Sequence, residues 1–135
     1  MITAIDSSVL WAIIKKEENS EAWCEALLGA AAEGALIISP VAFAELAPSA
    51  SNSVALMDFL NRLSISYEPI SCEAAFLAGE TFKAYRKAGG PRQHLVPDFL
   101  IAAHAQIRAD RLAATDRGYL RKWFSDLPLL TLTQR

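Results

Sequence analysis

The chain has 135 residues, 53% of them hydrophobic, which suits one globular domain (1–135) with a substantial core and excludes a disordered protein. Its longest apolar runs are too short to cross a bilayer, and its first residues lack the basic segment of a signal peptide. We therefore expect a cytoplasmic protein with no membrane partner. Cys24 and Cys72 lack metal-ligand spacing and are expected to be buried thiols.

Charge is distributed unevenly despite a formal net value of −2. Residues 1–82 contain three Lys or Arg against eleven Asp or Glu, whereas residues 83–122 contain nine basic against three acidic side chains. The second segment therefore predicts a face that binds polyanions. The alternative is that these cations lie on ordinary solvated helix faces.

Predicted strands and helices alternate along the chain. Short apolar runs, several rich in β-branched residues, predict strands at 1–5, 36–38, 65–69, 112–115 and 129–132. Helices are predicted between them at 8–16, 20–34, 40–47, 54–63, 72–88, 97–105 and 118–124. Predicted caps are Ser7 or Ser8, Ser20, Ser39 and Ser71. This alternation indicates an α/β sandwich, in which right-handed crossovers place helices on both faces of a parallel sheet.

Four acids share one predicted location in this fold. Asp6 and Asp116 each follow a strand, while Glu45 and Asp98 lie on early turns of helices that begin at the same edge. Ligands of such sheets bind outside the carboxyl ends of the strands, so the four carboxylates are expected to face one pocket. Asp98 opens the apolar stretch 97–105, and stabilisation of a helix N-terminus is the alternative for it.

Carboxylates that gather in one pocket need compensation. Two unit charges about 4 Å apart repel by roughly 4 kcal/mol at an effective dielectric of about 20. Either protons are taken up or a hard divalent cation neutralises the set. Oxygen ligands without clustered Cys or His favour Mg²⁺ or Mn²⁺ over zinc. Ions of this kind activate a water for in-line attack on a phosphodiester, without a protein nucleophile.

Four segments, in order along the chain, carry a resemblance to a known family. They are 5–10 (IDSSVL), Glu45-Leu46 after Ser39-Pro40, 97–105 (PDFLIAAHA) and 114–119 (ATDRGY). This ordered set resembles the signature segments of PIN domains, and the length and completeness of the chain resemble the VapC toxins of bacterial type II toxin–antitoxin pairs. The resemblance implies a three-layer sandwich with a central, mostly parallel five-stranded sheet. It also implies a Mg²⁺- or Mn²⁺-dependent ribonuclease, often a homodimer, that a VapB antitoxin inhibits by covering the acidic pocket.

The same resemblance implies roles for individual side chains. Asp6, Asp98 and Asp116 would bind the metal, directly or through water. Glu45 would position or deprotonate the attacking water. Thr115 would orient Asp116 or a metal-bound water.

Three further residues are candidates for the substrate side of the site. Arg92 and Arg117 lie in loops that flank the expected pocket and would bind substrate phosphates. Surface solvation is the alternative for Arg92, and salt-bridging to the acids is the alternative for Arg117. Ser7 would orient Asp6 or a bound water, with helix capping as its alternative.

His104 is expected to lie away from this site. It follows Asp98 by six residues, which places it about 240° around the helix. We therefore predict a hydrogen-bonded histidine in or near the core, and not a metal ligand.

Two functions of other classes are also compatible with the sequence. A non-catalytic module would use the acidic pocket to dock a basic segment of a partner. A receiver-type α/β protein would use a strand-end aspartate as a phosphoryl acceptor, although no lysine stands at a late strand end as such a site requires. The ordered set of four acids favours the metal-dependent endoribonuclease of toxin type.

Overall fold

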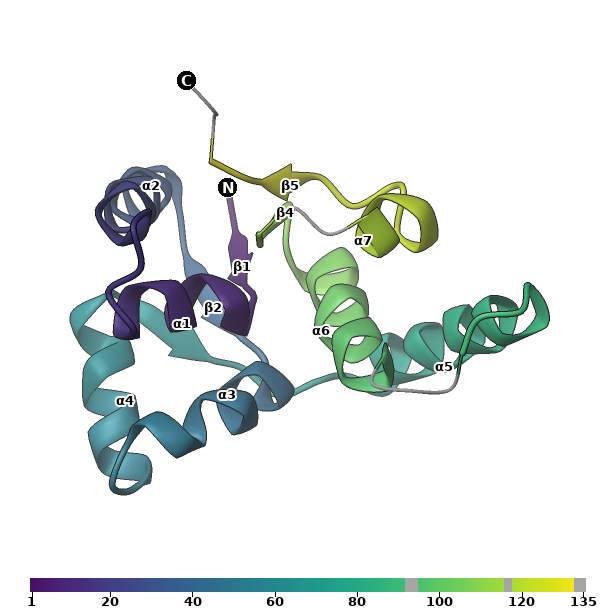
Figure 1. Cartoon of the computed structure of the whole chain (residues 1–135), viewed down its shortest axis with the longest axis horizontal. Helices are drawn as coiled ribbons and strands as arrows, with labels where there is room; N and C mark the ends of the chain where they lie inside the picture. The colour runs from purple at the N-terminus through teal and green to yellow at the C-terminus, as the bar shows by residue number, and fades with distance from the viewer. Residues whose placement is uncertain (92–94, 116–117, 133–135) are drawn as a thin grey trace.

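The computed structural model describes residues 1–91, 95–115 and 118–132, and its centre is a five-stranded sheet (Figure 1). Every strand pairing is parallel, in the order β3-β2-β1-β4-β5. The strands are β1 (Thr3–Ile5), β2 (Leu36–Ile38), β3 (Ile65–Tyr67), β4 (Arg111–Ala113) and β5 (Leu129–Leu130). The predicted α/β sandwich is confirmed, with a sheet that is wholly parallel.

Helices form the connections between the strands. They are α1 (Ser7–Ile14), α2 (Ser20–Glu33), α3 (Pro40–Leu46), the 3₁₀ turn η1 (Ala47–Ser49), α4 (Ser53–Arg62), α5 (Cys72–Lys87), α6 (Leu95–Arg108) and α7 (Gly118–Trp123). In Figure 1, α1, α2 and α4 lie at one end of the molecule and α5–α7 at the other, with β1 and β4 between them. Within the described ranges, no helix has the length and apolar character needed to cross a bilayer.

Serine caps fix the start of two helices, as predicted. The Ser39 hydroxyl accepts a hydrogen bond from Ala42 N–H at 3.2 Å at the start of α3. Ser71 accepts one from Ala74 N–H at 3.0 Å at the start of α5. Each cap satisfies one of the backbone donors that a helix N-terminus leaves without a partner.

The other two predicted caps are wrong. Asp6, and not Ser7 or Ser8, is the N-cap of α1, because its carboxylate reaches the N–H of Ser8. α2 starts at Ser20 itself, after Asn19, whose side chain makes no capping hydrogen bond. The first of these corrections bears on function, because it gives Asp6 a structural role as well.

α6 is the central helix of the core. Phe99 and residues 101–105 each expose 2% or less of their surface, so the helix is buried on most sides. His104 is 1% exposed, and its Nε2 lies 3.2 Å from Glu68 Oε1. Arg108 donates hydrogen bonds of 2.7 and 3.1 Å to the same carboxylate. The prediction of a hydrogen-bonded core histidine is confirmed.

This network lowers the pKa of two of its groups. Burial lowers the pKa of His104, against the opposing effect of the Glu68 carboxylate. Hydrogen bonding from Arg108 lowers the pKa of Glu68. The folded chain therefore favours a neutral imidazole beside an ionised carboxylate.

Two predicted burials on α5 and α2 are wrong. Cys72 is exposed and Cys24 is only half-buried. Phe76 on α5 is likewise 69% exposed, although its side chain is large and apolar. The buried positions of α5 include Ala74 and Ala78. Residues 72 and 76 each lie about 160° around the helix from Ala74, because each residue advances about 100°. They therefore point away from α6, against which α5 packs.

We expect acidification to destabilise the folded chain through His104. Its folded-state pKa is below the ordinary value of about 6.5, so the unfolded chain binds more protons below that pH. The free energy of unfolding therefore falls as the pH drops. His104→Gln keeps a hydrogen-bond donor near Glu68 but does not titrate, so it should flatten this loss between about pH 7 and 5.5. Denaturant unfolding across that range provides the measurement, and an unchanged pH dependence in the variant would assign the effect to other groups.

Candidate active site

The order in which the chain adds strands to the sheet reverses at the central strand β1. β1 pairs with β2 on one side and with β4 on the other, and Ile5 lies opposite Ala113. The backbone N–H of Asp6 extends this pairing by donating to Ala113 O at 2.9 Å. Ligands of parallel α/β sheets bind outside the strand ends at such a reversal. Asp6 and Thr115, which lie just beyond the two strands, therefore occupy the position at which this fold places a ligand.

Ser8 joins Asp6 to the end of β4. The Ser8 N–H donates to Asp6 Oδ2 at 3.2 Å, and the Ser8 hydroxyl donates to the same oxygen. Ser8 Oγ in turn accepts a hydrogen bond from Thr115 N–H at 3.4 Å. Asp6 is only 4% exposed, and its described donors both belong to Ser8. This serine therefore holds the nearly buried carboxylate in a fixed orientation.

The sequence-based prediction gave Ser8 no role in the site. A signal for it exists in the chain: an aspartate at the end of a strand, followed two residues later by a serine at the start of a helix. An N-cap carboxylate accepts the N–H of the residue two positions on, so the side chain of that residue lies beside it.

Glu45 reaches the same edge from the neighbouring strand. α3 follows β2 directly, and its cap at Ser39 fixes where the helix starts. The Ser7 hydroxyl donates to Glu45 Oε1 at 2.8 Å, across 38 residues of sequence. Ser7 is nearly buried, whereas Glu45 is exposed to solvent. Adjacent serines of α1 thus hold two carboxylates, with Ser8 on Asp6 and Ser7 on Glu45.

Asp98 lies in the first turn of α6 and is half-buried. α6 packs against α3, the helix of Glu45, and runs directly into β4, so its first turn lies at the carboxyl edge of the sheet. Asp6 and Glu45 are therefore each bound by one of two adjacent serines of α1, and helix packing brings Asp98 to the same edge. Three predicted site residues lie outside the described residues: Arg92, Asp116 and Arg117.

The described donors at this edge suit a hard cation. All are oxygens: the carboxylates of Asp6, Glu45 and Asp98 and the hydroxyls of Ser8 and Thr115. Mg²⁺ and Mn²⁺ prefer such ligands. Within 1–91, 95–115 and 118–132, no ion pair compensates the nearly buried Asp6 carboxylate, and a divalent cation would supply that charge. In those same ranges no group of three or more His, Cys, Asp or Glu side chains is close enough to hold a metal ion.

Comparison with known proteins agrees with this architecture. The PIN domain family model matches residues 3–123. The sequence has no significant match among curated proteins.

Solved structures with this fold cover nearly the whole chain. One is the crystal structure of VapBC2 from Rickettsia felis bound to a DNA fragment from their promoter, with a TM-score of 0.71 and 20% identity. Another is VapBC-1 from nontypeable Haemophilus influenzae, with a TM-score of 0.67 and 16% identity. A third is DNA-bound VapBC from Salmonella typhimurium, with a TM-score of 0.63 and 17% identity. Each match covers 97% of this chain and 98% of the other. At these identities the likeness establishes the fold.

The double role of Asp6 predicts opposite effects for two substitutions. Asp6→Ala removes the N-cap of α1 and should lower the free energy of unfolding by about 1 kcal/mol. Asp6→Asn keeps a side-chain oxygen for Ser8 and removes the nearly buried charge, so its stability should equal or exceed that of the unchanged chain. Denaturant unfolding in buffer with EDTA measures both. An Asn variant as unstable as the Ala variant would show that the charge itself stabilises the start of α1.

Proposed function

Since the chain belongs to the PIN domain family, we propose that it is a Mg²⁺- or Mn²⁺-dependent endoribonuclease that acts as the toxin of a toxin–antitoxin pair. The observation that carries the proposal is the arrangement of three acids from distant segments at one edge of the sheet. Asp6 and Glu45 are held by neighbouring serines, and Asp98 lies on the helix that packs beside Glu45. An edge rich in carboxylates suits hydrolysis of a phosphodiester through a bound cation better than it suits anion binding.

In this proposal, Asp6, Asp98 and Asp116 hold the cation. A divalent cation bound there would supply Lewis-acid activation of water and neutralisation of charge on the scissile phosphate. Glu45 orients the attacking water and accepts its proton, and the 2.8 Å hydrogen bond from Ser7 fixes the carboxylate that does so. The backbone N–H of Thr115 donates to Ser8 Oγ and so helps to fix Asp6. The hydroxyl of Thr115 would orient Asp116 or a bound water. Arg92 and Arg117 bind phosphate oxygens of the substrate.

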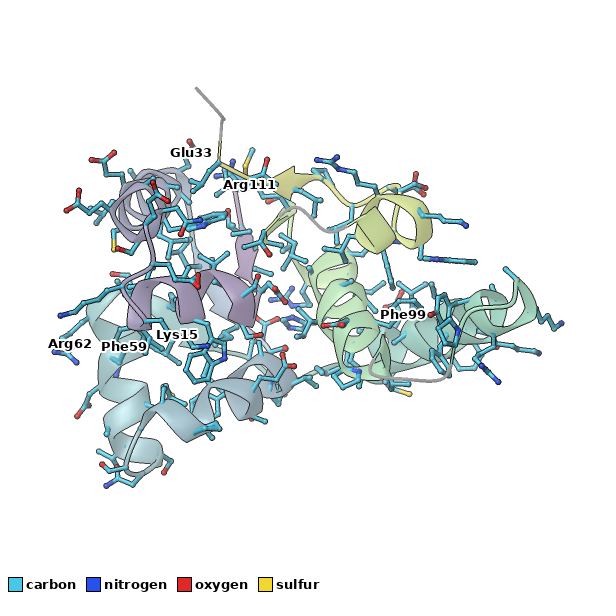
Figure 2. The ribbon with its side chains drawn as sticks, in the orientation of Figure 1. Lys15, Glu33, Phe59, Arg62, Phe99 and Arg111 are labelled. Carbon is cyan, nitrogen blue, oxygen red and sulfur yellow. The ribbon has the colours of Figure 1, made fainter. Side chains whose placement is uncertain are left out.

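A VapB-like antitoxin is the proposed partner, and the neighbouring structures named above are VapBC complexes. A groove of about 500 Å³ between α1, η1 and α4 suits the apolar side chains of an antitoxin segment. Its lining includes Ile13, Ile14, Leu56 and Phe59, together with Lys16 and Arg62. Figure 2 labels Phe59 and Arg62 at the end of the molecule that holds α1 and α4. The homodimer implied by the family resemblance remains a prediction.

The purified protein should cleave RNA in the presence of Mg²⁺ or Mn²⁺ and lose this activity in EDTA. Asp6→Asn and Asp98→Asn should each lower the rate by about 10²-fold or more, because each removes a proposed ligand charge. Asp58→Asn, the same change at an exposed carboxylate on α4, is the matched control and should leave the rate unchanged. The assay is the cleavage rate of a labelled RNA, with circular dichroism to show that each variant is folded.

Two outcomes would redirect the proposal. Cleavage that persists in EDTA would contradict the metal-dependent mechanism. A folded chain that never cleaves RNA with Mn²⁺, yet binds a basic peptide through Asp6 and Asp98, would instead establish the interaction module as its function.

The bond between Ser7 and Glu45 predicts a smaller effect that depends on Glu45. Ser7→Ala should lower the cleavage rate about tenfold, since a hydrogen bond to a charged group contributes roughly 1.5–3 kcal/mol. Glu45→Gln should lower it by about 10²-fold or more. The double variant should be no slower than Glu45→Gln alone, because Ser7 acts through that carboxylate. Multiplicative effects in the double variant would show that Ser7 acts independently of Glu45.

A further inference from the structure

Two short segments of the chain carry cations without acids. Residues 83–88 and 118–124 contain five basic side chains and no Asp or Glu. All five are exposed: Lys83, Arg86, Lys87, Arg121 and Lys122. The nearest acids in sequence, Glu80 and Asp126, lie three residues before Lys83 and four after Lys122. We refer to these five side chains as the α5–α7 basic patch.

Aromatic packing brings the two segments together. The Tyr85 ring on α5 packs edge-on against the Trp123 ring on α7, with centroids 5.5 Å apart. Both segments also pack on Phe99 of α6, since the Phe99 ring lies 5.5 Å from Tyr85 and 5.3 Å from Phe124. Phe99 is fully buried, so this ring cluster is anchored in the core. The cations on either side of Tyr85 and Trp123 therefore lie at the same end of the molecule.

The same cluster connects the patch to the site. Phe99 directly follows Asp98 in the first turns of α6, so one short stretch of helix carries both a site carboxylate and the base of the patch. Figure 1 shows α7 and the C-terminal end of α5 at the same end of the molecule, beyond α6. A polyanion whose phosphate lies at the acidic edge would meet these cations as it continues past α6.

The opposite end of the molecule has a different charge. The turn before α2 and its first half carry exposed acids at Glu17, Glu18, Glu21 and Glu25. The cations at that end include Lys15 and Arg62, which Figure 2 labels on the far side of the view from Phe99. Those acids repel a phosphate backbone, whereas the patch attracts one.

We propose that the α5–α7 basic patch binds the phosphate backbone of the RNA strand flanking the scissile bond. This assignment rests on the proposed nuclease function and extends it, because it gives the strand a direction across the protein. Backbone contacts of this kind strengthen binding without selecting a sequence. The patch thus acts in substrate affinity, while base selection is left to other residues.

Salt-dependent binding tests the patch directly. The probe is a fluorescein-labelled oligouridylate about 20 nucleotides long, bound to the Asp98→Asn chain so that it is not cut. Adding Lys87→Gln and Lys122→Gln should weaken binding about tenfold at about 0.1 M salt, and should reduce the slope of log affinity against log salt by about 1.4, or about 0.7 per lost contact. Lys15→Gln with Arg62→Gln makes the same charge change at the other end and should leave the slope unchanged.

Three results would overturn the proposal that the α5–α7 basic patch binds RNA. One is an equal loss of RNA affinity in the two paired variants, which would mean that only net charge matters. Another is no loss in either pair. The third is binding of polyglutamate of matched length as tightly as RNA, which would identify an acidic protein as the partner. Thermal unfolding of each variant shows that the fold is retained.

Cleavage assays separate this inference from the proposed function. A chain that binds RNA through the patch but never cleaves it would refute the nuclease and retain the patch. A chain that cleaves long RNA equally well with and without Lys87 and Lys122 would refute the patch and retain the nuclease. If both the nuclease function and the role of the patch are correct, the variant with Lys87→Gln and Lys122→Gln should raise KM for long RNA. It should leave cleavage of a short oligonucleotide unchanged.

Discussion

The hydrogen bond from Asp6 N–H to Ala113 O joins the ends of β1 and β4, and the arrangement of the site depends on it. It places the start of α1 directly beside the segment that follows β4, so that Ser8 can bind Asp6 and Thr115 at once. Because the two strands lie side by side at the reversal of the sheet, residues more than one hundred positions apart act as neighbours. A nearly buried carboxylate is tolerated there because it also caps a helix, which gives it donors even without a cation.

α6 connects the parts of the molecule that bear on function. Its first turn carries Asp98, the next residue Phe99 supports the ring cluster under the basic patch, and His104 and Arg108 bind Glu68 after β3. A helix with this many buried contacts has little freedom to shift. The position of Asp98 relative to Asp6 and Glu45 is therefore set by core packing, and not by a flexible loop.

Charge and apolar surface are separated along the molecule. The apolar groove between α1 and α4 and the acids of α2 lie at one end, and the α5–α7 basic patch lies at the other. The acidic edge lies between them. In the proposed function, a protein partner and an RNA substrate would thus approach from different ends and meet at the site.

The sequence by itself determined the alternation of strands and helices, the caps at Ser39 and Ser71, and the buried helix with Asp98, because these depend on local periodicity and on hydrogen bonds that span a few residues. It also identified Asp6 and Glu45 as residues of one edge, since the ends of parallel strands share that edge. Only the tertiary structure decided that Asp6 and not a serine caps α1, that Ser7 binds Glu45, and that Tyr85 meets Trp123. It likewise decided that Phe76 faces solvent. These features depend on which face of a helix meets which neighbour, and contacts between segments remote in sequence leave no local pattern from which to predict them.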